Sequence, residues 1–239
     1  ISCSLVGSEM CIRDRYHAEE THYLINGSTA GILSAVMGCT KKGGKILMAR
    51  NCHKSVYHAV FLNELRPVYI YPEFDETMEL NMAVSPEKIE RLLEEHKEVQ
   101  AVVLTSPTYD GVLSDIERIS EIVHQKKIPL IVDEAHGAHF GFHPYFPENA
   151  NTKGADVVIH SLHKTLPALT QTALIHLNGT RIDRRKIRNY LHIFQTSSPS
   201  YVLMASMDEC LRTVAEQGDV LFETYVKNLE SKRVESVSY

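Results

Sequence analysis

The 239-residue sequence has little of what marks several protein classes. Its five cysteines are an odd set without CxxC spacing, which argues against a disulfide framework or a zinc ribbon and suits a reducing compartment. No uninterrupted apolar stretch approaches the length of a membrane span. The net charge is -5 and no run of Lys and Arg forms a stripe, so nucleic acid is not an expected partner. These absences predict a cytoplasmic protein that binds neither nucleic acid nor membrane.

The two ends of the chain differ from the rest. Residues 1–15 (ISCSLVGSEMCIRDR) show neither helical nor strand periodicity and lack an initiator Met, so we interpret them as an adaptor-like, non-native segment. Residues 236–239 are a candidate for the same interpretation. The remainder, residues 16–235, is expected to form one domain, because 44% hydrophobic content can bury a core and no repeat or low-complexity linker divides it.

Short apolar runs alternate with amphipathic segments through this domain. The pattern predicts a three-layer α/β fold, in which helices flank a mostly parallel seven-stranded sheet and further helices follow at the C-terminal end. The predicted strands are 22–25, 45–49, 68–71, 101–105, 129–133, 156–160 and 172–176. The predicted helices are 29–39, 54–65, 86–96, 116–125, 182–194 and 201–216, followed by a polar helix from 221.

Two of the predicted strands lead directly into polar residues. Residues 161–164 (SLHK) follow the strand at 156–160, and Asp133 ends the strand at 129–133. A lysine beside a low-polarity cleft has a lowered pKa and a more nucleophilic amine. Because parallel strands end at the same edge of a sheet, Asp133 and Lys164 are expected to converge. An amine that bonds to an aldehyde and a carboxylate that holds a pyridinium proton suit pyridoxal phosphate.

Three other segments follow predicted strands, and each allows two interpretations. Residues 26–29 (NGST) place backbone N–H groups and two hydroxyls at a helix start, where they can bind an anion or simply cap the helix. His53 opens the next helix and can stack on an aromatic cofactor or act as a cap. Residues 105–111 (TSPTYDG) form a turn that can face a ligand or serve only as a connection.

Asp133, His136 and His139 offer a different constellation. Their DxxHxxH spacing can place a carboxylate and two imidazoles around zinc or iron, as in a metal-dependent hydrolase. This alternative leaves residues 161–164 without a role, so no metal site is expected.

Six motifs occur in the order NGST, RNCHKS, TSPTYDG, DEAHGAH, SLHKT and TSSPSY. Together they resemble the large domain of the Orn/Lys/Arg decarboxylases, pyridoxal-phosphate enzymes of the aspartate aminotransferase fold (fold type I). The resemblance runs from about residue 16 to 235. It implies decarboxylation of arginine, lysine or ornithine to an amine and CO2, in polyamine biosynthesis, and a smaller C-terminal domain that this chain does not include. Another fold type I enzyme, or a non-catalytic protein with this fold, is the alternative.

The resemblance implies roles for four catalytic residues. Lys164 is the lysine that bonds to the cofactor, and His163 is its neighbour there. Asp133 is the partner of the pyridine nitrogen, and His53 stacks on one face of the ring. Lys164 or His163 is the candidate donor of the proton that replaces the lost carboxylate.

The resemblance also implies further cofactor contacts. Ala135 packs on the ring face opposite His53, and the phosphate is bound by hydroxyls. Thr196 and Ser197 reach into the site of a neighbouring subunit, so a homodimer or higher homo-oligomer with shared sites is expected, and the fragment alone is expected to be weak or inactive. The contacts beyond the four catalytic residues are Ser28, Thr29, Ala135, His136, Ser161, Thr196 and Ser197.

Overall fold

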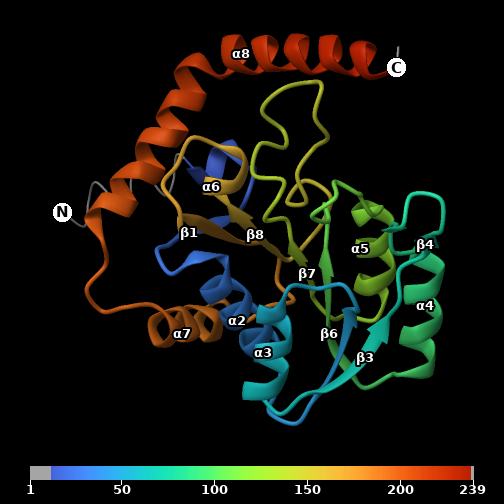
Figure 1. Ribbon diagram of the computed structural model, residues 1–239. Helices are drawn as coiled ribbons and strands as arrows, with labels where there is room; N and C mark the ends of the chain where they lie inside the picture. The colour runs from blue at the N-terminus through green and yellow to red at the C-terminus, as the bar shows by residue number, and fades with distance from the viewer. Residues whose placement is uncertain (1–11, 238–239) are drawn as a thin grey trace.

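A computed structural model describes residues 12–237 (Figure 1), so most of the two end segments interpreted as non-native, residues 1–11 and 238–239, lie outside the described part. One sheet of seven strands forms its centre, in the order β1-β9-β8-β7-β6-β2-β3. Its strands match the seven predicted ones to within two residues at each end. They are β1 (Glu20–Leu24), β2 (Lys45–Ala49), β3 (Arg66–Ile70), β6 (Val99–Thr105), β7 (Leu130–Asp133), β8 (Val157–Ser161) and β9 (Ala173–Leu177).

The sheet is mostly parallel, as the sequence predicts. The five strands from β3 to β8 in the sheet order pair in parallel, whereas β9 is antiparallel to both β8 and β1. Two antiparallel steps restore the direction, so β1 ends at the same edge as β8. The register shows this directly: Ala173 of β9 is paired with Leu24, the last residue of β1, and with Ser161, the last residue of β8. The segments that follow β1, β6, β7 and β8 therefore all leave the sheet at one edge.

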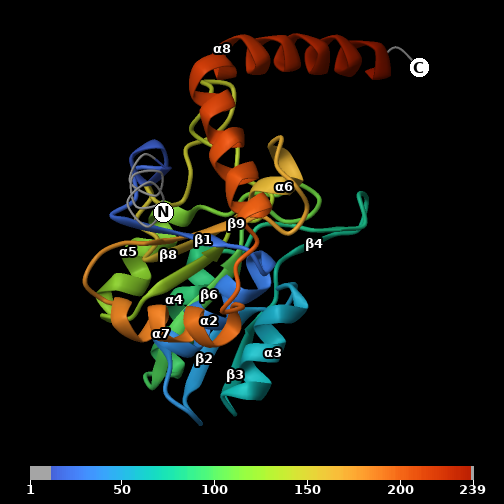
Figure 2. The same cartoon turned by 90° about the vertical axis from the view of Figure 1, so that its left-hand side faces the viewer.

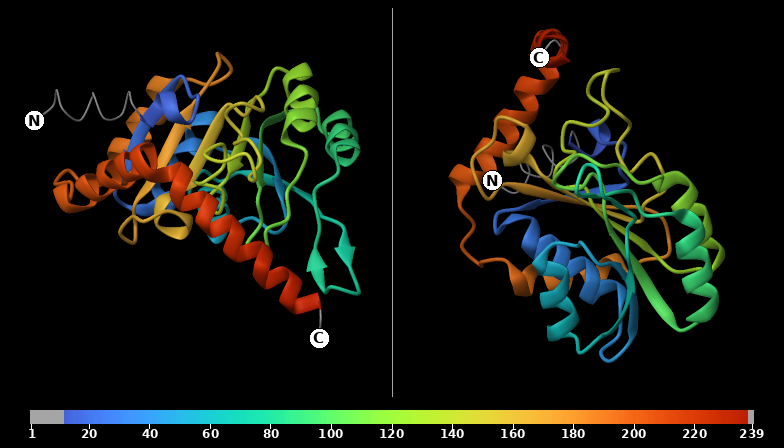
Figure 3. Two further views of the ribbon diagram at one scale, coloured as in Figure 1. Left: turned by 90° about the horizontal axis from the view of Figure 1, so that it is seen from above. Right: turned by 45° about the vertical axis from the view of Figure 1, so that its right-hand side comes forward.

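Helices cover both faces of the sheet and give the three layers that the sequence predicts (Figures 1 and 3). Helices α2, α3 and α7 lie on one side, and α4 and α5 pack together on the other. Helix α6 is a single turn directly after β8. None of the described helices combines the length and the apolar character that crossing a bilayer requires. The bounds are α2 (Gly27–Cys39), α3 (Lys54–Leu62), α4 (Pro86–Glu95), α5 (Ile116–Gln125), α6 (Leu162–Thr165) and α7 (Arg184–Phe194).

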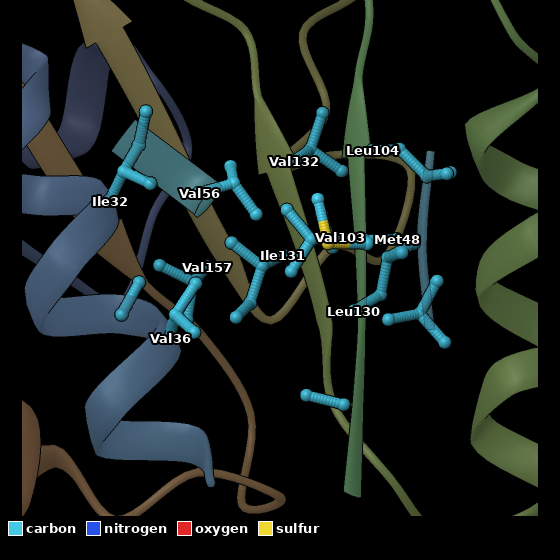
Figure 4. Close-up of a cluster of buried hydrophobic side chains, with 14 of the residues drawn as sticks. Ile32, Val36, Met48, Val56, Val103, Leu104, Leu130, Ile131, Val132 and Val157 are labelled. Carbon is cyan, nitrogen blue, oxygen red and sulfur yellow. The ribbon is translucent and has the colours of Figure 1, made fainter. Parts of the chain in front are cut away.

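The main core lies between α2 and the central strands. Figure 4 shows Ile32 and Val36 of α2 beside apolar side chains of the sheet such as Val157 and Ile131, and all four residues are buried. Central strands with helices on both faces bury both sets of alternating side chains, which is why their sequences are continuous apolar runs. Packing of helices on both faces thereby holds the ends of the central strands in place, and the polar residues lie at these ends.

Helix α8 (Tyr201–Val237) departs from the expectation of two helices. It is one continuous helix that bends between two arms (Figures 1 and 2). Gly218, its one glycine, lies in the gap that was predicted between residues 216 and 221, and helix bends of this kind occur at glycine without ending the helix. The sequence analysis also missed the hairpin of β4 (Phe74–Asp75) and β5 (Leu80–Asn81), because strands of two residues show no periodicity.

Close packing of α2 on α7 generates the first prediction. A Cβ atom at Gly38 would lie only 3.1 Å from the Cα atom of Ile187, in addition to contacts with its side chain. Gly38→Ala is therefore expected to lower the free energy of unfolding by about 1–3 kcal/mol, although alanine is the better helix former. Urea unfolding followed by circular dichroism measures the change.

Gly218→Ala is the matched control for Gly38→Ala, because the nearest atom to its new Cβ would be Val214 Cγ1 at 3.4 Å, an ordinary contact. This variant is expected to be neutral or more stable by up to about 1 kcal/mol. A Gly38→Ala protein as stable as the unaltered chain would show that α2 and α7 do not approach this closely.

Candidate active site

The carboxyl ends of β7 and β8 bring Asp133 and Lys164 to one edge of the sheet. Asp133 is paired with Ile159 in the β7–β8 ladder, and Lys164 follows in the single turn of α6. The backbone N–H of Ser106 donates to the Asp133 carbonyl at 3.1 Å, which places the loop after β6 at the same edge. The structure thus brings together the acid and the amine that the sequence analysis selected.

Lys164 has a less basic amine than an ordinary lysine. Partial burial lowers its pKa, and the negative charge of Asp133 opposes that change. Lys164 Nζ lies 3.0 Å from His136 Nε2. The lysine also borders a cavity of about 470 Å³, whose walls include residues 165–167 and the side chains of Leu221 and Phe222 on α8. A neutral amine is consequently available closer to neutral pH, beside a space that a small molecule can occupy.

Asp133 is a carboxylate with little access to water, since only 3% of the residue is exposed. Burial raises its pKa to about 6, whereas the charge of Lys164 and the N–H of Ala135 lower it. That N–H donates to Asp133 Oδ1 at 3.2 Å, and Ala135 is itself buried. A cation placed against this carboxylate would hold it ionised at neutral pH, which is the task expected of the partner of a protonated pyridine nitrogen.

His136 lies between Lys164 and the loop after β6. Burial lowers its pKa, and the positive charges of Lys164, His53 and His163 lower it further, so the imidazole is largely neutral at pH 7. Its ring meets that of Tyr109 edge to face, with 5.6 Å between ring centroids. Sequence reasoning did not select Tyr109, although its place in a loop that leaves the shared strand edge was an available signal.

His53 and His163 have specific local partners. His53 precedes α3, and its Nδ1 accepts the N–H of Ser55, so the capping interpretation holds. Burial and then the charge of Lys164 lower the pKa of His53, which places the ring within electrostatic reach of the lysine. His163 Nδ1 donates to the carbonyl oxygen of Thr172 at 2.8 Å, because a carbonyl can only accept. That bond fixes the orientation of the ring and keeps a hydrogen on Nδ1.

The start of α2 offers open N–H donors at the same edge. Asn26 makes no side-chain capping bond within the described part of the chain, so the first-turn N–H groups around Ser28 and Thr29 are available to an anion. Gln171 Nε2 donates to the Ile25 carbonyl at 2.8 Å and holds this segment beside the start of β9. The structure therefore places both predicted phosphate-binding residues of this segment at a suitable helix terminus.

Ser161 supplies an observation that itself points to a ligand. Its hydroxyl oxygen is buried and has no hydrogen-bond partner among residues 12–237. Leaving a buried polar group unsatisfied costs about 1–3 kcal/mol, and a phosphate oxygen would remove that cost. The unpaired hydroxyl, the open helix terminus, the buried carboxylate and the weakly basic lysine together fit pyridoxal phosphate.

Thr196 and Ser197 are exposed and lie outside this cluster of buried groups. The N–H of Thr196 donates to Asn26 Oδ1 at 3.2 Å, and Thr196 Oγ1 accepts the N–H of Ser198 at 3.1 Å. The loop thus lies beside the start of α2 in its own chain. Its predicted contact with a neighbouring subunit stays a prediction.

The metal-site alternative has no geometric support. Within residues 12–237, no group of three or more His, Cys, Asp or Glu side chains is arranged to hold a metal ion. His139 packs edge to face against Phe140 and Phe146, with 4.9 and 4.5 Å between ring centroids. Burial lowers the pKa of His139 to about 4, as suits an imidazole in an aromatic cluster. Asp133 and His136 instead face Lys164.

Comparison with curated proteins shows relatives across most of the chain. It is 44% identical over 194 residues to the uncharacterized protein YaaO of Bacillus subtilis, a match that covers 81% of this chain and 40% of that protein. It is 32% identical over 218 residues to an arginine decarboxylase of Bacillus cereus, covering 91% of this chain and 47% of that protein. The chain spans less than half the length of these relatives.

Solved structures show the same architecture. The constitutive lysine decarboxylase of Escherichia coli superposes with a TM-score of 0.81 at 26% identity, covering 96% of this chain and 34% of that one. Serine palmitoyltransferase from Sphingomonas wittichii superposes with a TM-score of 0.71 at 18% identity, over 90% of this chain and 51% of that one, and shares the fold alone. Residues 4–238 match the family model for the Orn/Lys/Arg decarboxylase major domain, and the chain belongs to that family.

Proposed function

We propose that the chain is the pyridoxal-phosphate-binding domain of an enzyme that converts arginine, lysine or ornithine to the corresponding amine and CO2. The observation that carries the proposal is the convergence of a weakly basic Lys164 with the buried Asp133 at one strand edge. The unpaired buried hydroxyl of Ser161 supports a phosphate-bearing ligand. Relatives named as arginine and lysine decarboxylases support a basic substrate.

Bound pyridoxal phosphate would supply an electron-accepting ring that stabilises the negative charge left on the substrate when its carboxylate departs as CO2. Asp133 would hold the proton on the ring nitrogen, since an ionised carboxylate in a buried site strongly favours a cation against it. His53 and Ala135 would contact the two ring faces. Ser28, Thr29 and Ser161 would bind the phosphate, together with the first-turn N–H groups of α2.

Lys164 has two tasks in this proposal. Its Nζ would hold the cofactor through the aldehyde, and His136 Nε2, 3.0 Å away, would accept the proton that the ammonium form of Lys164 loses when the amine becomes neutral. After CO2 departs, Lys164 or His163 returns a proton to the substrate carbon. The hydrogen on His163 Nδ1, kept there by its bond to Thr172, leaves Nε2 as the atom that can carry this proton.

The second prediction tests the covalent role of Lys164. Incubation with pyridoxal phosphate followed by borohydride reduction should label Lys164, because its lowered pKa leaves more neutral amine than at other lysines. Peptide mapping by mass spectrometry locates the label. Lys164→Ala should abolish it, and Lys54→Ala, at the start of nearby α3, should retain it. A label on another residue, or no label, would show that pyridoxal phosphate does not bond to Lys164.

The third prediction concerns Asp133. In the full-length protein, Asp133→Asn should lower turnover by about 100-fold or more, because a neutral amide cannot keep the ring nitrogen charged. Borohydride labelling of Lys164 should persist, since the phosphate contacts and the amine are unchanged. Release of CO2 from arginine, lysine and ornithine gives the rate and the preferred substrate. Asp110→Asn, in an exposed loop, is the control, and equal rates for the two variants would refute the assigned role.

We further propose that the full-length protein works as a dimer or larger homo-oligomer. The supporting feature is the exposed loop of Thr196 and Ser197, which is held next to the α2 terminus rather than in the buried site. A two-fold axis would let each subunit lend this loop to the other, and two equivalent shared sites would result.

The fourth prediction tests this exchange by mixing two inactive full-length variants. One carries Lys164→Ala, and the other carries Thr196→Ala with Ser197→Ala. Heterodimers would contain one intact composite site, so activity should rise from near zero toward the fraction expected from random pairing. Native mass spectrometry confirms that heterodimers form. If they form without any recovery of activity, Thr196 and Ser197 do not act across the interface.

A further inference from the structure

A chain of buried polar side chains crosses the sheet next to the active site. His160 Nε2 lies 2.6 Å from Glu134 Oε2, and His160 Nδ1 lies 3.0 Å from His176 Nε2. His176 Nδ1 in turn lies 2.7 Å from Thr21 Oγ1. All four residues are buried. They belong to β1, β9, β8 and the residue directly after β7, so the polar chain spans four neighbouring strands.

The strand register places this polar chain on one sealed face. Thr21 is directly paired with His176, and strand alternation puts both on the same side of the sheet as His160. The ring of Tyr16 covers them, with 4.6 Å between its centroid and that of His160 and 4.8 Å to that of His176. The Tyr16 hydroxyl donates to the Ala138 carbonyl at 2.7 Å. Every link is therefore satisfied by protein groups and shielded from water.

The hydrogen bonds along this chain have a consistent direction. A carboxylate at Glu134 only accepts, so His160 Nε2 carries a hydrogen toward it, and the Ala150 N–H donates to the same carboxylate at 3.1 Å. Burial, together with the charge of His160, lowers the pKa of His176 well below its ordinary value, so this ring is neutral. When the His160 ring carries a hydrogen on Nε2 alone, His176 donates through Nε2 and accepts from the Thr21 hydroxyl through Nδ1.

Glu134 connects the polar chain to the active site through the backbone. Its carbonyl accepts the N–H of Gly137 at 2.9 Å and closes a turn that carries Ala135 and His136. A Cβ atom at Gly137 would lie 2.7 Å from Glu134 Cγ, so the glutamate side chain packs directly against the turn. The Glu134 side chain therefore supports the turn on the side away from Lys164, and the same turn carries His136, which contacts Lys164.

We propose that Glu134 and His160 are positioning residues that hold the turn of residues 134–137, and thereby keep His136 within hydrogen-bonding distance of Lys164. The inference rests on the proposed function for its assumption that Lys164 is the reactive amine. The buried bond between Glu134 and His160 acts through the turn and touches neither substrate nor cofactor.

Release of the turn has a defined consequence for Lys164. If His136 withdraws, the already partly exposed amine meets more water, and the lysine pKa rises toward its ordinary value because burial is the main cause of its depression. Asp133 is the charged group that acts on the Lys164 pKa, whereas His53 and His163 act on the pKa of His136. These groups stay unchanged when Glu134 is altered, so a change in the Lys164 pKa reports on the turn.

The fifth prediction compares two buried carboxylates. Glu134→Ala should raise the Lys164 pKa toward its ordinary value and so lower the reactivity of the amine at pH 7 severalfold. Asp156→Ala is the matched control, since Asp156 is 1% exposed and 2.7 Å from His124 Nε2, but lies at the opposite end of β8. It should lower stability without moving the Lys164 pKa.

Competitive acetylation of the chain by acetic anhydride across a pH series, read by mass spectrometry, measures the Lys164 pKa without any cofactor. This readout is independent of the proposed function, which fails separately if pyridoxal phosphate does not bond to Lys164. Equal Lys164 pKa values in the Glu134→Ala and Asp156→Ala proteins would overturn the inference.

Glu134→Gln keeps the shape of the side chain and tests the inference even if Glu134→Ala does not fold. The amide oxygen can accept from the Ala150 N–H and the amide nitrogen can donate to His160 Nε2, which would move the hydrogens of His160 and His176 to Nδ1 and make the Thr21 hydroxyl an acceptor. Nitrogen NMR of the two rings should show this tautomer exchange, with the Lys164 pKa unchanged. The inference would be overturned if the tautomers stayed unchanged. It would also be overturned if the Lys164 pKa shifted as much as in the Glu134→Ala protein.

Discussion

The exclusion of water from Asp133 is the constraint on which the site depends. A buried carboxylate resists ionisation, and its pKa of about 6 reflects that cost. Lys164 offsets part of the cost with its positive charge, and its own amine is made less basic by partial burial. Burial moves both pKa values toward neutrality, and the attraction between the two charges opposes both changes. This balance requires both side chains to be held at one place, and the sheet holds them there.

The order of the strands explains how distant segments reach the same place. Parallel pairing carries the ends of β6, β7 and β8 to one edge, and the two antiparallel steps through β9 bring the end of β1 there too. The open N–H groups of α2 therefore lie at the edge that carries Ser161. Local sequence supplies each polar group, and the topology brings the groups to one edge of the sheet.

Much of the fold, and the proximity of Asp133 to Lys164, could be predicted from the sequence, because the strands that carry these residues have local signals. The run Leu130–Asp133 is buried throughout, and such runs mark central strands. The convergence of Asp133 and Lys164 followed from the rule that parallel strands end at one edge. The bond between Glu134 and His160 could not be predicted in this way, since it depends on the β7–β8 register between residues 26 positions apart in the sequence. The bend of α8 was missed because a polar stretch with a glycine is typical of both a break and a bend.

Asp133 and Glu134 are adjacent in the sequence, and their carboxylates point to opposite faces of the sheet. Asp133 is paired with Ile159 and interacts with Lys164, whereas Glu134 meets His160, the next residue of β8, on the face covered by Tyr16. Strand side chains alternate with a period of two, so a shift of one residue in the β7 register would exchange these environments. Glu134 would then face the lysine, and Asp133, with a shorter side chain, would face the imidazole. The register of one strand pair therefore decides which carboxylate interacts with Lys164 and which one meets His160.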